Sequence, residues 1–195
     1  MAGEAAAALD AGALRLLETS VRLMESEAEL HLTPQPEDPV QVRLVSALAC
    51  AFGAADREPS PAGAARILAR LAGGGGGGLA GACFKPASPE TGAPIRLARD
   101  PGGVNGRRGG GTALAELALA PGVETVWDGR LLLRATGPGW AVRSGGGSGA
   151  PQVSQGEGTL ESRWLVADRV RMLLWRAPGW RNGPRIAPSS RGFEV

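Results

Sequence analysis

The side chains that could carry out catalysis or bind a metal are few and scattered along the chain. His31 is the only histidine, and Cys50 and Cys83 lie in separate apolar runs without a C-x-x-C spacing. A metal site needs several such ligands at set spacings, and a nucleophilic cysteine needs a basic partner. Asp128 could act as a general acid, but its place in an Asp-Gly turn explains it without chemistry. We therefore expect a surface or capping histidine and buried thiols, and we predict no catalytic residue and no metal site.

Two glycine-rich segments could contact phosphate. The run Gly73–Gly78 is followed by an apolar segment instead of the Lys-Ser/Thr that opens the helix of a P-loop, so we interpret it as a flexible turn. Arg107 and Arg108 lie among glycines further along the chain. They could touch a nucleic-acid backbone, or they could belong to a solvated linker.

Charge is unevenly distributed although the net charge is only +2. Residues 1–60 contain ten acidic and four basic residues, whereas the remainder contains nine acidic and seventeen basic ones. A basic C-terminal part permits an anionic partner such as RNA, and a simply solvated surface is the alternative. Lys85 is the only lysine among many arginines, which indicates coding bias and weakens any argument from arginine content alone.

Nothing in the sequence indicates insertion into a membrane. No apolar run approaches 18 residues, so we expect no transmembrane helix. The first residues include Glu4 and Asp10 and lack a basic leader, which is unlike a signal peptide. We expect a cytoplasmic protein.

The N-terminal part has helical periodicity. Apolar residues recur on one face from Glu4 to about Glu29, and residues 28–32 could instead form a short strand. Two further helices are each preceded by a capping residue and a proline: Asp38-Pro39 before Val40–Phe52, and Ser60-Pro61 before Ala62–Ala72.

The following part has the alternation of antiparallel strands. Residues 79–84 and 94–99 predict one hairpin, and residues 121–143 predict another with a short third strand. Asp128-Gly129 suits a type I′ turn, in which both central residues have φ > 0. We expect Trp127 to pack under this turn and Arg130 to lie at its rim.

Together these elements predict an α+β fold. We divide it into a helical subdomain (1–73), a small subdomain rich in β-hairpins (74–143), a Gly/Ser linker (144–158) and a poorly ordered, basic Trp/Arg tail (159–195). The tail's mixture of tryptophan and arginine is typical of a surface that stacks on bases and holds a phosphate backbone. It also fits an amphipathic helix or hairpin packed on the body of the protein, and we favour that interpretation.

Five segments, in this order and spacing, resemble one family: PVQVRLVSALACAFG (39–53), AARILARL (64–71), LAGAC (79–83), IRLAR (95–99) and VWDGR (126–130). The chain is similar across roughly residues 10–143 to the region that follows the ATP-binding domain in bacterial tRNA(Ile)-lysidine synthases. Those ligases use ATP to adenylate the wobble cytidine of an isoleucine tRNA, and lysine then displaces AMP. Residues 159–195 do not match the family's terminal segment.

The resemblance implies a partial protein without its own catalytic centre. The family's nucleotide loop, S-G-G-x-D-S, is absent, and Ser148 stands where the aspartate belongs in the superficially similar run 144–149. ATP is thus implied for the whole family enzyme and no cofactor for this chain. The implied partners are tRNA and an N-terminal catalytic domain. Our candidates for RNA binding are Arg107, Arg108, Arg130 and Arg134.

Two other interpretations remain open. The acidic first helix and the apolar helices after it could form a protein-interaction or structural module, or the chain could be an inactive remnant; neither would bind nucleic acid. An independent enzyme is disfavoured because a catalytic pair with plausible spacing is missing from the sequence.

Overall fold

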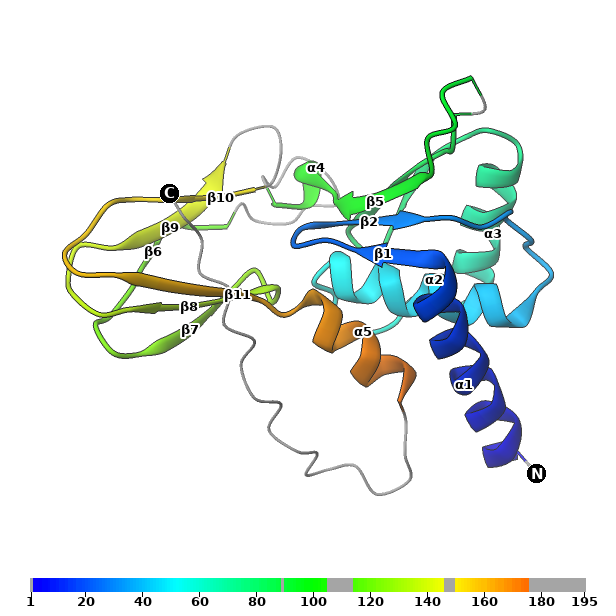
Figure 1. Cartoon of the computed structure of the whole chain (residues 1–195), viewed down its shortest axis with the longest axis horizontal. Coiled ribbons are helices and arrows are strands. Elements are labelled where there is room, and N and C mark those ends of the chain that lie inside the picture. The colour runs from blue at the N-terminus through cyan, green and yellow to red at the C-terminus, as the bar shows by residue number, and fades with distance from the viewer. Residues whose placement is uncertain (1, 89, 105–113, 146–149, 176–195) are drawn as a thin grey trace. The chain divides into compact units, whose positions relative to one another are not determined.

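The computed structural model describes residues 2–88, 90–104, 114–145 and 150–175. It has the α+β fold that the sequence predicts, with helices near the N-terminus and antiparallel sheets (Figure 1). The described residues form two compact units: the first contains those up to Arg99 together with helix α5, and the second contains Asp100–Leu165. Of the tail expected at 159–195, residues from 176 onwards lie outside the described part.

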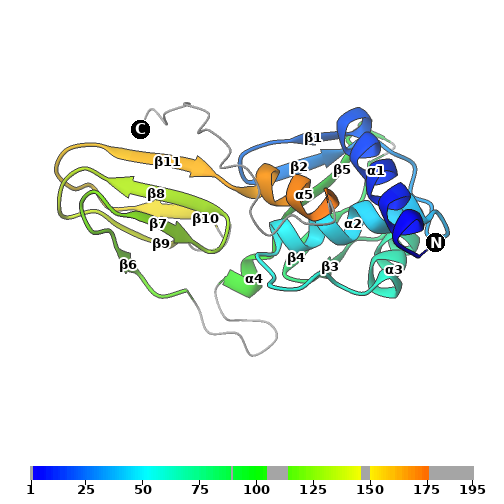
Figure 2. The ribbon, with the colours of Figure 1, turned by 90° about the horizontal axis from the view of Figure 1, so that it is seen from below.

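The helices of the first unit are α1 (Ala2–Ser20), α2 (Pro39–Phe52), α3 (Pro61–Ala72) and α5 (Val166–Leu174). Helix α2 lies at the centre and contacts α1, α3 and α5 (Figure 2). Ten of its fourteen residues are buried, among them Leu44, Leu48 and Phe52. Because almost every face of α2 is covered, this helix is the core of the unit.

Both predicted helix caps are present. The Asp38 carboxylate accepts a hydrogen bond from the Val40 N–H at 2.8 Å, with Pro39 in the first turn of α2. The Ser60 hydroxyl accepts one from Gly63 N–H at 3.2 Å at the start of α3. These side chains pair backbone donors that the first helical turn leaves without partners, which fixes where each helix begins.

A five-stranded antiparallel sheet, in the order β1-β2-β5-β4-β3, completes the first unit. Its strands are β1 (Val21–Leu23), β2 (Glu27–Leu30), β3 (Gly77–Leu79), β4 (Ala82–Lys85) and β5 (Ile95–Arg99). Helices α2 and α3 cover one face of the sheet (Figure 1), against which residues such as Leu30, Phe84 and Leu97 are buried. The predicted hairpin between residues 79–84 and 94–99 corresponds to the pairing of β4 with β5.

The first helix is shorter than its periodicity predicts. It ends at Ser20, and residues 21–30 form the hairpin of β1 and β2 instead of a further helical turn. Ala28 and Leu30 are buried because β2 also pairs with β5, which is far away in the sequence. Such long-range pairing outweighs a local helical preference, and it could not be seen in the hydrophobic period.

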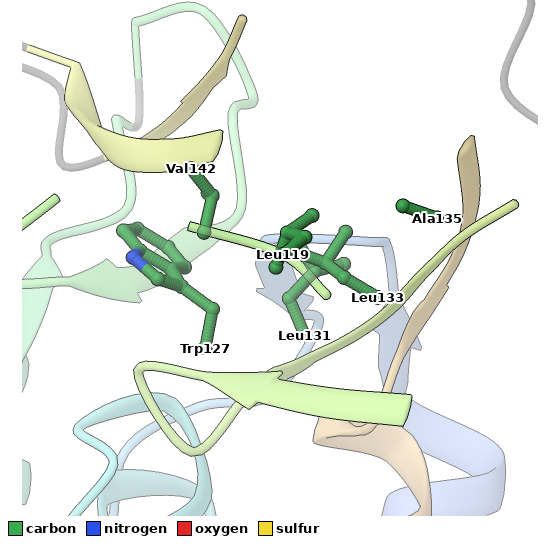
Figure 3. Close-up of a cluster of buried hydrophobic side chains, with 6 residues drawn as sticks. All are labelled: Leu119, Trp127, Leu131, Leu133, Ala135 and Val142. Carbon is green, nitrogen blue, oxygen red and sulfur yellow. The ribbon is translucent and has the colours of Figure 1, made fainter. Parts of the chain in front are cut away.

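The second unit consists of short strands in two three-stranded antiparallel sheets. One has the order β10-β9-β6 and the other β11-β8-β7. The elements are α4 (Pro101–Val104), β6 (Leu117–Ala118), β7 (Glu124–Trp127), β8 (Leu131–Ala135), β9 (Ala141–Gly145), β10 (Ala150–Val153) and β11 (Leu160–Trp164). Side chains of both sheets form one apolar core, in which Trp127, Leu131 and Leu133 lie opposite Val142 (Figure 3).

These units follow a different division from the one suggested by composition. Residues 74–99 belong with the helices, because β3–β5 join β1 and β2 in one sheet. The stretch 144–158 includes strand β10, and the described part of the tail forms β11 and α5. Composition cannot reveal such pairing, because a strand's partner is chosen by burial across the fold.

Candidate nucleic-acid interface

Of the four arginines predicted to bind RNA, Arg107 and Arg108 lie outside the described residues. Arg130 and Arg134 lie four positions apart in the second unit, Arg130 in the turn before strand β8 and Arg134 within that strand. Their surroundings differ, but each of the two arginines lies near a carboxylate of the same unit.

Arg130 is buried inside the second unit, so the prediction that it lies at the rim of the turn is wrong. Its side chain is 1% exposed. The guanidinium contacts the Asp128 carboxylate through Nε at 2.8 Å and Nη2 at 2.7 Å, and it lies over the Trp164 ring at 5.7 Å. Leu165 N–H also donates to the Arg130 carbonyl. An arginine held in this way stabilises the fold and cannot reach an RNA phosphate.

The turn itself has the predicted conformation. Asp128 and Gly129 have φ values of 49° and 60°, and Arg130 N–H donates to the Trp127 carbonyl at 3.1 Å. The paired residues that flank the loop are Trp127 and Leu131. Arg130 therefore belongs to the loop, as one residue more than the two-residue turn. Strand β11 then covers it, since Trp164 pairs with Leu131. The burial therefore comes from a segment more than thirty residues away in the sequence.

Arg134 is half-exposed but lies between two carboxylates. On the outer face of its sheet it is the register partner of Glu124 on β7 and of Glu161 on β11. Its Nη1 lies 3.9 Å from the Glu161 Oε2. Carboxylates on both sides oppose the approach of a phosphate, which makes Arg134 a poor RNA contact.

A stronger cationic surface lies on the face of the first unit's sheet that points away from α2 and α3. The strands place four side chains in one register row across it, namely Arg22, Glu29, Arg96 and Lys85. The side chains of Arg22 and Arg96 are 74% and 56% exposed, and Lys85 is also exposed. We call these three cations the basic row.

Glu29 organises the basic row from its centre. Its carboxylate lies 3.9 Å from Arg22 Nη1 and 3.7 Å from Arg96 Nη2, and His31 Nε2 is 3.7 Å away. These distances are at the long end of ion pairing, and solvent-exposed pairs of this kind bind each other weakly. Both guanidinium groups can therefore turn to an incoming anion at little cost, while the row keeps a net positive charge.

A second row of outward-facing residues lies beside the basic row. The neighbouring register row consists of Glu27, Ala98, Cys83 and Gly78, so most of its side chains are small. The outward-facing residues of these five strands include no aromatic side chain. This face can hold a sugar-phosphate backbone, but its strands offer nothing on which a base could stack.

Sequence reasoning missed the basic row, although one signal was available. In PIRLAR, the alternation of Ile95 and Leu97 with Arg96 predicts an outward arginine at that position. Arg22 was assigned to a helix, where it would face Glu18 instead of Glu29. Because the sequence pattern extends the first helix through residues 21–29, it does not reveal that these cations align across neighbouring strands.

Of the two thiols expected to be buried, only Cys50 is, and Cys83 is partly exposed. Cys50 is buried, and its Sγ donates to the Ala55 carbonyl at 3.2 Å. Burial raises the pKa of the Cys50 thiol above its ordinary value of 9.0, against the opposing charge of Arg169. Such a thiol is a poor nucleophile at neutral pH. Within the described ranges, no three His, Cys, Asp or Glu side chains are grouped to hold a metal ion, and no helix is long and apolar enough to cross a bilayer.

Comparison with known proteins found no match among protein-family models, curated proteins or solved structures.

Proposed function

We propose that this chain is an RNA-binding accessory region of the kind found beside the catalytic domain of tRNA(Ile)-lysidine synthases. Its role is to hold tRNA through the sugar-phosphate backbone. Adenylation of the wobble cytidine with ATP, and its displacement by lysine, are then the work of a separate catalytic domain. Within this chain we assign no catalytic residue and no bound cofactor.

The observation that carries the proposal is the basic row on the open sheet face. Arg22, Arg96 and Lys85 come from three strands and lie at the same level across the sheet. Neutralising phosphates releases condensed counterions, which is the main source of non-specific affinity for nucleic acids. The short side chains of the neighbouring row allow a rigid backbone to approach the sheet closely.

The segments that resemble the family also support the proposal by their positions. PVQVRLVSALACAFG covers α2 and its C-cap, AARILARL lies in α3, and IRLAR is strand β5. LAGAC forms the turn from β3 to β4. Four of the five segments thus belong to the unit that carries the basic row, and IRLAR contains Arg96 itself.

The proposal is tested by measuring how tightly the chain binds isoleucine tRNA at low ionic strength. The double variant Lys85→Gln/Arg96→Gln should bind about tenfold or more weakly, because two phosphate contacts are lost. The matched control is Arg134→Gln, which removes an exposed arginine flanked by carboxylates and should leave the affinity unchanged.

Two results would contradict the proposal. The first is absence of binding by the unaltered chain at low salt, which would favour a protein-interaction module or an inactive remnant. The second is a double variant with unaltered affinity, in particular if Arg107→Gln/Arg108→Gln abolished binding. That result would place the interface on the glycine-rich segment and not on the sheet.

A further inference from the structure

The basic row has one acidic residue within it, Glu29 on β2. Its register partners are Arg22 on β1 and Arg96 on β5, and these three strands lie side by side (Figure 1). Lys85 on β4 follows Arg96 in the same row. A carboxylate repels a phosphate placed directly over it and attracts a hydrogen-bond donor. Glu29 therefore determines which part of a nucleic-acid backbone can lie between the two arginines.

Glu29 lies deeper in this surface than the residues around it. Its side chain is 15% exposed, whereas those of Arg22 and Arg96 are 74% and 56% exposed. The third neighbour, His31, is also 56% exposed. The more exposed guanidinium groups meet an incoming phosphate first, so the carboxylate contacts only a part of the backbone that fits between them.

These neighbours hold the carboxylate through long contacts. Arg22 Nη1 and His31 Nε2 lie 3.9 Å and 3.7 Å from Glu29 Oε2, and Arg96 Nη2 lies 3.7 Å from Oε1. All three distances exceed that of a hydrogen bond. When the arginines turn to phosphates, Glu29 gives up weak contacts and gains room for a small donor. An ionised carboxylate only accepts hydrogen bonds, so the group that replaces the arginines must carry a hydrogen to donate.

The spacing of the row places a sugar over Glu29. Arg22 and Arg96 are on the strands at either side of Glu29, so their Cα atoms are roughly 10 Å apart. Two consecutive phosphates of a nucleic-acid strand are joined through one sugar. If each arginine pairs with one of these phosphates, the sugar between them lies over the carboxylate. In RNA that sugar carries a 2′-hydroxyl, whereas deoxyribose has no donor at this position.

We propose that Glu29 accepts a hydrogen bond from the 2′-hydroxyl of a ribose held between Arg22 and Arg96, and thereby makes the basic row select RNA over DNA. The inference rests on the proposed binding of RNA by this row. A bound backbone displaces water from Glu29, and a desolvated carboxylate without a new donor costs free energy. RNA supplies the donor and DNA does not, so the same carboxylate favours the one and disfavours the other.

The test compares a short RNA hairpin with the same hairpin carrying 2′-fluoro in place of every 2′-hydroxyl. Both ligands have the same charge and adopt A-form geometry, but the fluorinated one has no donor on its sugars. Fluorescence anisotropy at low ionic strength gives the affinity of the full chain for each. We expect the unmodified hairpin to bind about fivefold or more tightly than the fluorinated one, as one hydrogen bond to a charged acceptor predicts.

Variants of two glutamates separate the hydrogen bond from simple charge. Glu29→Met removes the acceptor and should abolish the difference between the two affinities, whereas Glu29→Gln keeps a neutral acceptor and should retain part of it. The matched control is Glu27→Met. Glu27 lies on the same face of β2 but has Ala98 as its register partner, so this variant removes an equal charge that is not paired with the arginines. It should strengthen binding of both hairpins and leave their ratio unchanged.

The inference is overturned if the unaltered chain binds both hairpins equally tightly, a comparison that needs no variant to fold. It is also overturned if Glu29→Met leaves the difference intact, or if Glu27→Met abolishes it. In each of these cases RNA still binds, so the proposed function stands. Absence of binding to both hairpins would instead contradict the proposed function, and this inference with it.

Discussion

The most informative single residue is Arg130, a cation fully enclosed in a small β unit. Its guanidinium pairs with the Asp128 carboxylate and lies over the ring of Trp164. Burial of an ion pair costs desolvation, and only good geometry with further contacts offsets that cost. The pair therefore matters less for its net contribution to stability than as a constraint on the fold, since losing either member deprives a buried charge of its close ionic partner.

Replacing Arg130 by methionine should destabilise the second unit by about 3–5 kcal/mol, because the buried Asp128 carboxylate loses this cation and its two short contacts. The double variant Arg130→Met/Asp128→Asn removes both charges of the pair, so its loss of stability should be smaller than that of Arg130→Met alone. Urea unfolding monitored by tryptophan fluorescence measures both. Arg134→Met, which removes an exposed arginine, is the control and should change the free energy of unfolding by less than about 0.5 kcal/mol. Equal losses for Arg130→Met and Arg134→Met would show that Arg130 is not enclosed as described.

At the scale of elements, the hairpin of β7 and β8 depends on backbone chemistry at its turn. Gly129 has a φ of 60°, in the left-handed region that a β-branched residue strongly resists. Gly129→Val should cost about 1–3 kcal/mol, whereas Gly129→Asn should cost less because asparagine tolerates this conformation. Thermal unfolding of the two variants gives the comparison. Identical stability of the valine variant and the unaltered chain would contradict a left-handed backbone conformation at Gly129.

Elements with local signals could be predicted from the sequence. The caps Asp38 and Ser60 and the turn at Asp128-Gly129 depend on residues within a few positions of one another, and the hairpin partner of IRLAR is the strand directly before it in the chain. The errors share a cause. The end of α1, the burial of Arg130 and the row that joins Arg22 to Arg96 all depend on strands that meet across long sequence distances. Periodicity within one segment carries no information about such partners.

At the scale of the whole molecule, the division of the sequence into an acidic first part and a basic remainder does not correspond to an acidic and a basic surface. Arg22 comes from the acidic first sixty residues, yet it joins Lys85 and Arg96 in the basic row. Asp10 and Glu58 come from the same acidic part and pair with Arg43 on the helical side. Cations and carboxylates that are close in the sequence thus lie on different sides of one unit.

The first unit also depends on a helix from near the end of the chain. Helix α5 packs on α1 and α2 with Val166, Val170 and Leu174 buried, and Arg169 donates to the Ala55 carbonyl at 2.9 Å. Leu174→Ala should therefore cost about 2–4 kcal/mol through the cavity that it leaves. Met172→Ala, on the exposed side of the same helix, should cost less than about 0.5 kcal/mol. Chemical denaturation distinguishes them, and equal effects would show that α5 is not part of this core.

The central claim is that the open sheet face holds RNA by its backbone through Arg22, Lys85 and Arg96. The most direct test is the salt dependence of the affinity for isoleucine tRNA. Three phosphate contacts predict a slope of log Kobs against log salt of about −2 to −3, which Lys85→Gln/Arg96→Gln should reduce in magnitude by about 2. A slope that is the same in the unaltered chain and in this double variant would contradict the account.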